Sequence, residues 1–269
     1  MGFKRCAAAL LAVLSVLCAA SHAWAAAEPL GTVPWLLTAT SEEDARYRQC
    51  SLGDAVSDAV RAYLGADIAI VNGGDLIGNL QPGEATSADV RGCLRADKTL
   101  ATARVSGAEL LEILEAALSH VTLTARREYD GEASAHDAFP QISGFRLSYD
   151  PGAAPGERIS RLTYQDRPVQ PEDSFLLAAT EEMLAGGYGL PAVADYTQSQ
   201  ETLGSVLEQY IRDGMEDYAI PRTRVYAMEV RTRRAFDRST ILMVVALAAV
   251  LALLFLPLGK KFVNLNKKK

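Results

Sequence analysis

Two uncharged apolar runs, one near each end, limit what this chain can fold into. The first run, at 6–20, follows two basic residues and precedes a small-residue stretch. It is shorter than the about 20 residues needed to span a bilayer, so residues 1–26 are typical of a cleavable signal peptide. The second run, at 239–259, is long enough to cross a bilayer once as a helix. The globular fold must therefore form between the two runs.

Together the runs predict a single-pass protein of the cell membrane. The signal starts translocation and the second run stops it, which places residues 260–269 in the cytoplasm and the globular domain on the extracytoplasmic side. Basic residues flank both sides of the second run, so charge counting alone does not decide the orientation. We expect residues 27–45 to be an N-terminal linker, 46–230 the folded domain and 231–238 a juxtamembrane linker.

The segment between the runs is acidic. Residues 1–26 and 239–269 hold seven of the 27 Lys and Arg residues and none of the 33 Asp and Glu residues, which leaves a net charge of −13 for the rest. This charge argues against a nucleic-acid partner. An apolar content of 49% permits a well-filled core.

Cysteine and histidine are scarce. Only Cys50 and Cys93 remain after signal cleavage, too few for a cysteine-built zinc site. One disulfide and two separate thiols both remain open, and export favours the disulfide if the two Cα atoms come within bridging distance. His120 and His136 have no spaced set of ligand partners, so we expect them to be ordinary surface residues.

The hydrophobic pattern predicts an α+β fold with a mixed sheet. Ser51 and Ser106 are placed to cap helices, and three Glu residues of the second helix, at 109, 112 and 115, are expected on its solvent face. Residues 122–138 are polar and aperiodic, which indicates a surface loop. The other expected elements are a helix from 87, a helix at 200–212, and strands at 67–71, 99–105, 144–149, 158–164, 175–179 and 223–230. They lack a regular strand–helix repeat, which favours α+β.

Five motifs follow one another along this segment. They read Cys-Ser-Leu-Gly-Asp-Ala-Val-Ser-Asp-Ala from Cys50, Ala-Asp-Ile-Ala-Ile-Val-Asn-Gly-Gly from Ala66, Lys-Thr-Leu from Lys98, Phe-Pro-Gln-Ile-Ser-Gly-Phe from Phe139 and Leu-Ala-Gly-Gly-Tyr-Gly from Leu184. In order and spacing they resemble the C-terminal, substrate-binding domain of the 5′-nucleotidase family. The resemblance covers roughly residues 46–230.

Complete enzymes of that family are exported nucleotide phosphohydrolases, which join an N-terminal two-metal phosphoesterase domain to this C-terminal domain. We expect only the C-terminal domain here, because about 20 residues separate the signal from the first motif and the histidines are too few for a two-metal site. The chain is therefore expected to carry no catalytic residue, metal or other cofactor of its own. Whether it serves an enzyme together with a separate metallophosphoesterase chain stays open.

The resemblance implies a substrate site that starts at the Asn-Gly-Gly motif. Asn72, Gly73 and Gly74 match a family stretch whose backbone amides and arginine face the substrate, although a simple turn would also explain the glycine pair. The arginine position is Ile77, and Asp75 brings the wrong charge for a phosphate. An aliphatic group cannot replace a bidentate cation.

The rest of the implied site comes from two later motifs. Phe139 matches one of two rings that hold the base in the family, while the position of the second ring is Met183. Tyr188 replaces an aspartate of the family's glycine-rich loop and could restore stacking; for Phe139 and Tyr188 a packing role remains the alternative. The predicted binding residues in these motifs are Phe139, Gln141, Gly186, Gly187 and Tyr188.

Three functions remain open. We favour a module that binds a nucleoside-like small molecule without hydrolysing it, with uncharged nucleosides bound better than nucleotides. The alternatives are an accessory subunit of a nucleotide hydrolase, active in nucleotide catabolism with a separate catalytic chain, and a structural surface domain.

Overall fold

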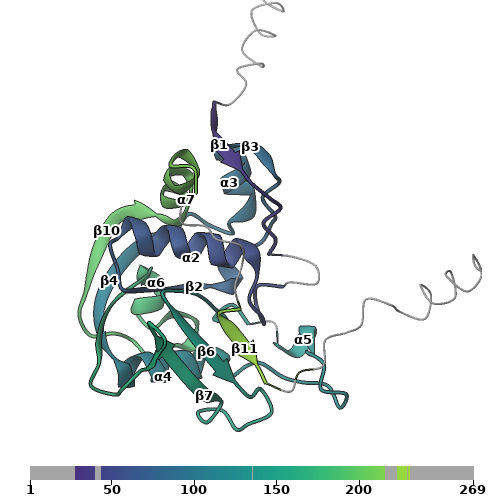
Figure 1. Ribbon diagram of the computed structural model, residues 1–269, viewed down its shortest axis with the longest axis vertical. Helices are drawn as coiled ribbons and strands as arrows, with labels where there is room; N and C mark the ends of the chain where they lie inside the picture. The colour runs from purple at the N-terminus through teal and green to yellow at the C-terminus, as the bar shows by residue number, and fades with distance from the viewer. Residues whose placement is uncertain (1–27, 40–43, 135, 216–222, 229, 231–269) are drawn as a thin grey trace, which may run out of the picture. The chain divides into compact units, whose positions relative to one another are not determined.

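The computed structural model describes residues 28–39, 44–134, 136–215, 223–228 and 230. In these residues the central element is a mixed five-stranded sheet with the order β10-β4-β9-β2-β5. Figure 1 labels β10, β4 and β2 of this sheet. The parallel pair is β2 with β9, and the other neighbours are antiparallel. Its strands are β2 (Ile68–Asn72), β4 (Thr99–Ser106), β5 (Pro140–Ser143), β9 (Ser174–Thr180) and β10 (Tyr196–Thr202). The mixed sheet predicted from the sequence is thus confirmed.

Two smaller sheets complete the strands of the described residues. One has the order β11-β6-β7-β8, and the other pairs β1 with β3. Their strands are β1 (Pro29–Val33), β3 (Gly83–Thr86), β6 (Phe145–Tyr149), β7 (Ile159–Tyr164), β8 (Arg167–Pro168) and β11 (Val225–Ala227). The helices are α2 (Ser51–Tyr63), α3 (Ser87–Cys93), α4 (Gly107–Leu118), α5 (Gly131–Ser134), α6 (Glu181–Leu184) and α7 (Leu203–Arg212), with short 3-10 turns η2 (Gly73–Asp75) and η3 (Gly187–Gly189).

The central strand β2 is buried on both faces. Successive side chains of a strand point to opposite faces. Ala69 and Val71 therefore pack into one cluster, with residues of α2 and α7. Ile68 and Ile70 pack into a second cluster, with residues of α4. A strand that is buried on both faces has apolar residues at nearly every position. The sequence therefore predicts β2 from its continuous apolar run.

Helix starts follow the expected capping chemistry with one correction. Ser106 caps α4 in a capping box with Glu109, as predicted. The cap of α2 is Cys50 and not Ser51, because the Cys50 sulfur accepts the Gly53 amide. The expected solvent face of α4 is also only partly solvated, since the Glu115 carboxylate accepts the Arg158 and Ile159 amides at 3.0 and 2.6 Å.

Two other expectations need correction. The segment assigned to an N-terminal linker contains β1, and Leu37 is fully buried in an antiparallel bridge with Leu80. Cys50 and Cys93 are both buried in the same core cluster but are not bonded to each other, so the disulfide that export favours is not formed in the structure. The Cys93 thiol donates to the Val90 carbonyl, and burial raises the pKa of this thiol to about 11.

The predicted signal peptide at 1–26 and the predicted membrane span at 239–259 lie outside the residues that the structure describes. Within the described ranges, no helix has the length and apolar character to cross a bilayer.

A buried ion pair fixes the last strand to the domain. Arg224 donates to both oxygens of Asp58, at 2.8 and 2.7 Å, and to the Ile142 carbonyl at 2.9 Å. Just beyond it, β11 pairs in parallel with β6. The Gln49 side-chain oxygen accepts the amides of Arg224 and Val225. The segment that leads toward residue 230 is therefore anchored to α2 and β5.

We expect Arg224→Ala to lower the free energy of unfolding of the full-length chain by about 3 to 5 kcal/mol, because Asp58 would remain buried without its cation. Arg146→Ala is the control, because Arg146 pairs with the exposed Asp166. This substitution should lower the free energy of unfolding by less than about 1 kcal/mol. Urea unfolding followed by circular dichroism measures both. Equal effects would contradict the anchoring role.

Candidate functional site

The Asn-Gly-Gly motif forms a tight turn at the carboxyl end of β2. Gly73 donates its amide to the Phe139 carbonyl at 2.8 Å, and Gly74 donates to the Asp137 carbonyl at 3.0 Å. A Cβ on Gly73 would lie 1.7 Å from the Ala45 carbonyl oxygen, so only glycine fits there. The family resemblance implies that these two amides face a ligand. In the structure they instead bond to neighbouring backbone carbonyls and hold the turn in place.

The turn presents Asp75 to three polar side chains from other parts of the chain. We call Asp75, Lys98, Glu182 and Tyr188 the polar cluster. The Lys98 ammonium lies 3.1 Å from an Asp75 oxygen and also contacts Glu182 and the Tyr188 hydroxyl. The Tyr188 hydroxyl lies 3.0 and 3.3 Å from the two Asp75 oxygens, to which it donates. The cluster thus ties the end of β2 to the start of β4, to α6 and to η3.

Burial and charge shift the pKa values within this cluster. Burial raises the pKa of the Asp75 carboxyl, an effect that Lys98 and Tyr188 oppose. Burial also raises the pKa of the Tyr188 hydroxyl, to about 12. The pKa of Lys98 is raised although burial opposes it, because Glu182, Tyr188 and Asp75 stabilise the ammonium, while the bond to Lys98 lowers the pKa of Glu182. With two carboxylates and one ammonium, the cluster has a formal charge of −1.

The glycine-rich loop closes over the cluster with left-handed backbone. Tyr188 has φ of 61°, and it lies between Gly186 at 88° and Gly189 at 76°. A Cβ on Gly187 would lie 2.6 Å from the Glu182 carbonyl oxygen, so the loop packs tightly onto α6. Of the residues predicted from the glycine-rich motif, Tyr188 reaches Asp75 through its hydroxyl, and Gly187 packs against Glu182.

Phe139 and Gln141, two other predicted site residues, are buried and contact other parts of the fold. Phe139 is only 1% exposed and packs in the second core cluster, so it presents no aromatic face to a ligand. Gln141 is fully buried; its amide donates to the Ala45 and Arg48 carbonyls at 2.9 Å, and its oxygen accepts the Cys50 amide. The packing alternative is the one that the structure supports for Phe139.

Asn72 is buried and yet lacks partners. Its side chain has no exposure, and neither of its amide atoms has a hydrogen-bond partner among the described residues. Leaving a buried polar group without a partner costs about 1 to 3 kcal/mol. Ile77, at the position of the family's arginine, is instead 46% exposed.

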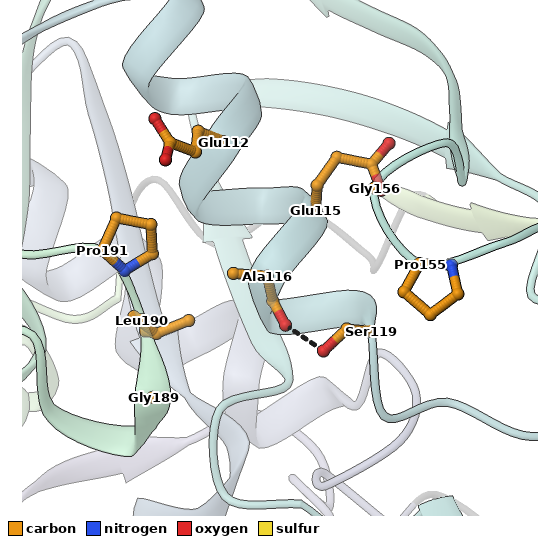
Figure 2. Close-up of a pocket in the computed structure, with 9 residues that line it drawn as sticks. All are labelled: Glu112, Glu115, Ala116, Ser119, Pro155, Gly156, Gly189, Leu190 and Pro191. Carbon is orange, nitrogen blue, oxygen red and sulfur yellow. Dashed lines mark hydrogen bonds between the residues drawn. The ribbon is translucent and has the colours of Figure 1, made fainter.

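An open hollow of about 550 Å³ adjoins the end of the glycine-rich loop (Figure 2). It is lined on one side by Glu112 and Ser119 of the α4 region and on the other by Gly189 and Pro191. Its acidic side chains and the Ser119 hydroxyl, which donates to the Ala116 carbonyl, provide no pairing of nucleophile and base. The hollow was not foreseen from the sequence.

The described residues contain no group of three or more His, Cys, Asp or Glu side chains arranged to hold a metal ion. His120 and His136 stack on each other, with ring centroids 3.6 Å apart and planes 8° from parallel. Two cofacial rings direct their nitrogen lone pairs alongside each other and not toward a shared ion.

Sequence reasoning missed Lys98 and Glu182 as parts of the site. Lys98 belongs to a recognised motif just before β4, and Glu182 precedes the glycine-rich loop by four residues. The signal that could have found them is Asp75 itself, an acidic residue just after a buried strand, which needs a cation from elsewhere because the family's arginine position holds Ile77.

The fold and the motifs place the chain in a family. The family model described as 5'-nucleotidase, C-terminal domain, matches residues 29–195. The chain therefore belongs to the 5′-nucleotidase C-terminal domain family. The match begins at β1, which supports including this strand in the domain.

Individual relatives are distant and longer. The chain is 26% identical over 168 residues to the trifunctional nucleotide phosphoesterase protein YfkN of Bacillus subtilis, and 25% identical over 169 residues to protein UshA of Yersinia enterocolitica. These matches cover 59% and 62% of this chain but 11% and 28% of the relatives, so the chain spans less than a third of either.

Solved structures show the same fold. The 5'-nucleotidase precursor of Thermus thermophilus superposes with a TM-score of 0.65 at 21% identity, over 83% of this chain and 43% of that one. The NAD nucleotidase of Haemophilus influenzae gives a TM-score of 0.57 at 16% identity, over 81% and 40%. Identities this low establish the architecture alone.

We expect Lys98→Met to lower the free energy of unfolding by about 3 kcal/mol at pH 7.5, because Asp75 would be buried without its cation. The loss should shrink at pH 5. Asp75 has a folded-state pKa above its ordinary value, so its contribution to stability is retained at low pH and lost as the pH rises through that pKa. Urea unfolding at both pH values measures the difference.

The control for this experiment is the same substitution in an Asp75→Asn background. Without an ionisable group at position 75, the effect of Lys98→Met should become small and nearly independent of pH. A loss that is equal at both pH values in the two backgrounds would contradict the ion pair.

Proposed function

We propose that this chain is a membrane-anchored extracytoplasmic domain that binds an uncharged, nucleoside-like small molecule and does not hydrolyse it by itself. The observation that carries the proposal is the composition of the polar cluster. Asp75, Glu182 and Lys98 give it a formal charge of −1 beside the glycine-rich loop. A cluster of this sign repels a phosphate and suits the hydroxyl and amine groups of a neutral ligand.

Charge outside the cluster works in the same direction. The exported segment carries a net charge of −13, which adds long-range repulsion for an anionic ligand. The family's arginine position holds Ile77, which is half-exposed and has no group that could pair with phosphate. Both features favour a nucleoside over its monophosphate.

The absence of hydrolysis by the chain alone is supported by the chemistry of its side chains. The described residues offer no metal-binding group, and the two histidines among them are stacked on each other. YfkN, whose name describes a nucleotide phosphoesterase, and UshA are both much longer than this chain. Their names therefore do not assign hydrolysis to the part that this chain matches.

Membrane anchoring and extracytoplasmic location are proposed from the sequence. The apolar run at 239–259 follows the domain by only a few residues, and the apolar run at 6–20 has the features of a signal peptide.

A structural surface domain is the second candidate, and one observation favours it. Phe139 and Gln141, which match the family's binding motif, serve packing and backbone contacts here. An accessory role beside a separate metallophosphoesterase chain remains compatible with the proposal, since such a chain would supply the hydrolysis that this one lacks.

Isothermal titration calorimetry of the full-length chain with adenosine and adenosine monophosphate tests the proposal. We expect adenosine to bind at least about tenfold more tightly than the monophosphate, since a missing charge-assisted contact removes about 1.5 to 3 kcal/mol. Ile77→Arg should restore about tenfold or more of monophosphate affinity, while the uncharged control Ile77→Met should not.

Phosphate release is measured on the same samples with and without added Mn²⁺ or Zn²⁺. Tighter binding of the monophosphate than of adenosine by the wild type would contradict the assignment of a neutral ligand. Metal-dependent hydrolysis that persists through repurification would contradict the absence of catalysis.

A further inference from the structure

We infer that the Tyr188 side chain occupies the place of the ligand in a closed state of the site, and that an uncharged aromatic ligand with a hydrogen-bond donor displaces it. This inference rests on the function proposed above and adds to it a closing residue and a ligand chemistry. It concerns the loop from Gly186 to Leu190 and the polar cluster beneath it.

The phenol of Tyr188 makes the set of contacts that a bound aromatic molecule would make. Its hydroxyl donates to the buried Asp75 carboxylate and accepts from the Lys98 ammonium. The ring itself packs against the second core cluster. The surrounding groups thus require one donor, one acceptor and an apolar ring from whatever lies between them.

A neutral heteroaromatic ring meets all three requirements. Adenine, for example, carries an amine donor next to a ring nitrogen acceptor on a flat aromatic ring. A phosphate would accept from Lys98, but it has no aromatic ring and its negative charge would be repelled by the carboxylates of Asp75 and Glu182. The contacts of Tyr188 therefore describe the class of ligand as well as the closed state.

The loop that carries Tyr188 is built to change conformation. Tyr188 adopts a left-handed backbone, which is unfavourable for a residue with a side chain, and it does so between glycines that adopt this conformation readily. Such a conformation persists only when surrounding contacts hold it. Here the contacts are those of the hydroxyl with Asp75 and Lys98, so their loss would release the loop at Gly186 and Gly189.

Asn72 supplies an independent observation. It precedes Asp75 by three residues and, by strand alternation, faces the same side of the sheet as Ile70, in the core cluster against which Tyr188 packs. Its amide is fully buried, and both of its polar atoms lack partners among the described residues. The closed state thus leaves a buried donor and a buried acceptor unused on the face of the sheet against which Tyr188 packs.

Two variants of the full-length chain separate the ring from its hydroxyl. Tyr188→Gly removes the side chain and suits the left-handed backbone, and it should lower the Kd for adenosine about tenfold, because binding no longer has to displace the phenol. Tyr188→Phe keeps the ring but loses both hydrogen bonds, and it should lower the Kd by a smaller factor. Tyr164→Phe is the control, since its hydroxyl only accepts from the exposed Gln165, and it should bind adenosine like the wild type.

Hydrogen exchange measures the opening without a ligand. The Gly186 and Leu190 amides, which bond to the Met183 and Gly187 carbonyls, should exchange about tenfold faster in Tyr188→Phe than in the wild type or in Tyr164→Phe. Unchanged exchange in Tyr188→Phe would overturn the closing role.

The binding results distinguish this inference from the function on which it rests. If the wild type binds adenosine and Tyr188→Gly binds it equally or more weakly, Tyr188 is a fixed wall or a direct contact, and only this inference fails. If neither the wild type nor either variant binds adenosine, the proposed function fails and the ligand assignment fails with it.

Discussion

The burial of the Asp75 carboxylate is the constraint on which the arrangement of the site depends. This side chain is only 1% exposed, and an ionised group so deep in a protein is stable only with a partner charge and hydrogen bonds. Lys98 and Tyr188 provide them, from the start of β4 and from the glycine-rich loop. One buried charge at the end of the central strand therefore determines where two other segments of the chain lie.

The family motifs persist here in two different roles. Gly73 and Gln141 keep the backbone architecture, because the first permits contact with Ala45 and the second joins the 45–50 segment to β5. Ile77 and Tyr188 depart from the family at the positions that would face a phosphate or a substrate. Buried contacts thus maintain the scaffold, and the two departures are among the features on which the proposal of a neutral ligand rests.

The sequence predicted the elements that have a strong hydrophobic period and missed those that depend on tertiary contacts. Strand β2 was foreseen because it is a continuous apolar run, and helices α2 and α4 because their apolar residues recur at helical spacing. Strand β10 was missed because it is polar and largely exposed, and β1 because its apolar residues are few. Lys98 and Glu182 approach Asp75 only after three segments meet, and no local pattern encodes that. Phe139 could be placed at a motif but not assigned to the core, because burial depends on what packs around it.

The most direct test of a neutral-ligand site at the polar cluster is to map adenosine on the protein by NMR. Amide and side-chain signals are compared with and without saturating adenosine, and again with its monophosphate. We expect adenosine to shift signals of Asp75, Lys98 and the loop from Gly186 to Leu190, and the monophosphate to shift them less at equal concentration. Shifts confined to the hollow around Glu112 and Ser119, or larger shifts at the cluster with the monophosphate, would contradict it.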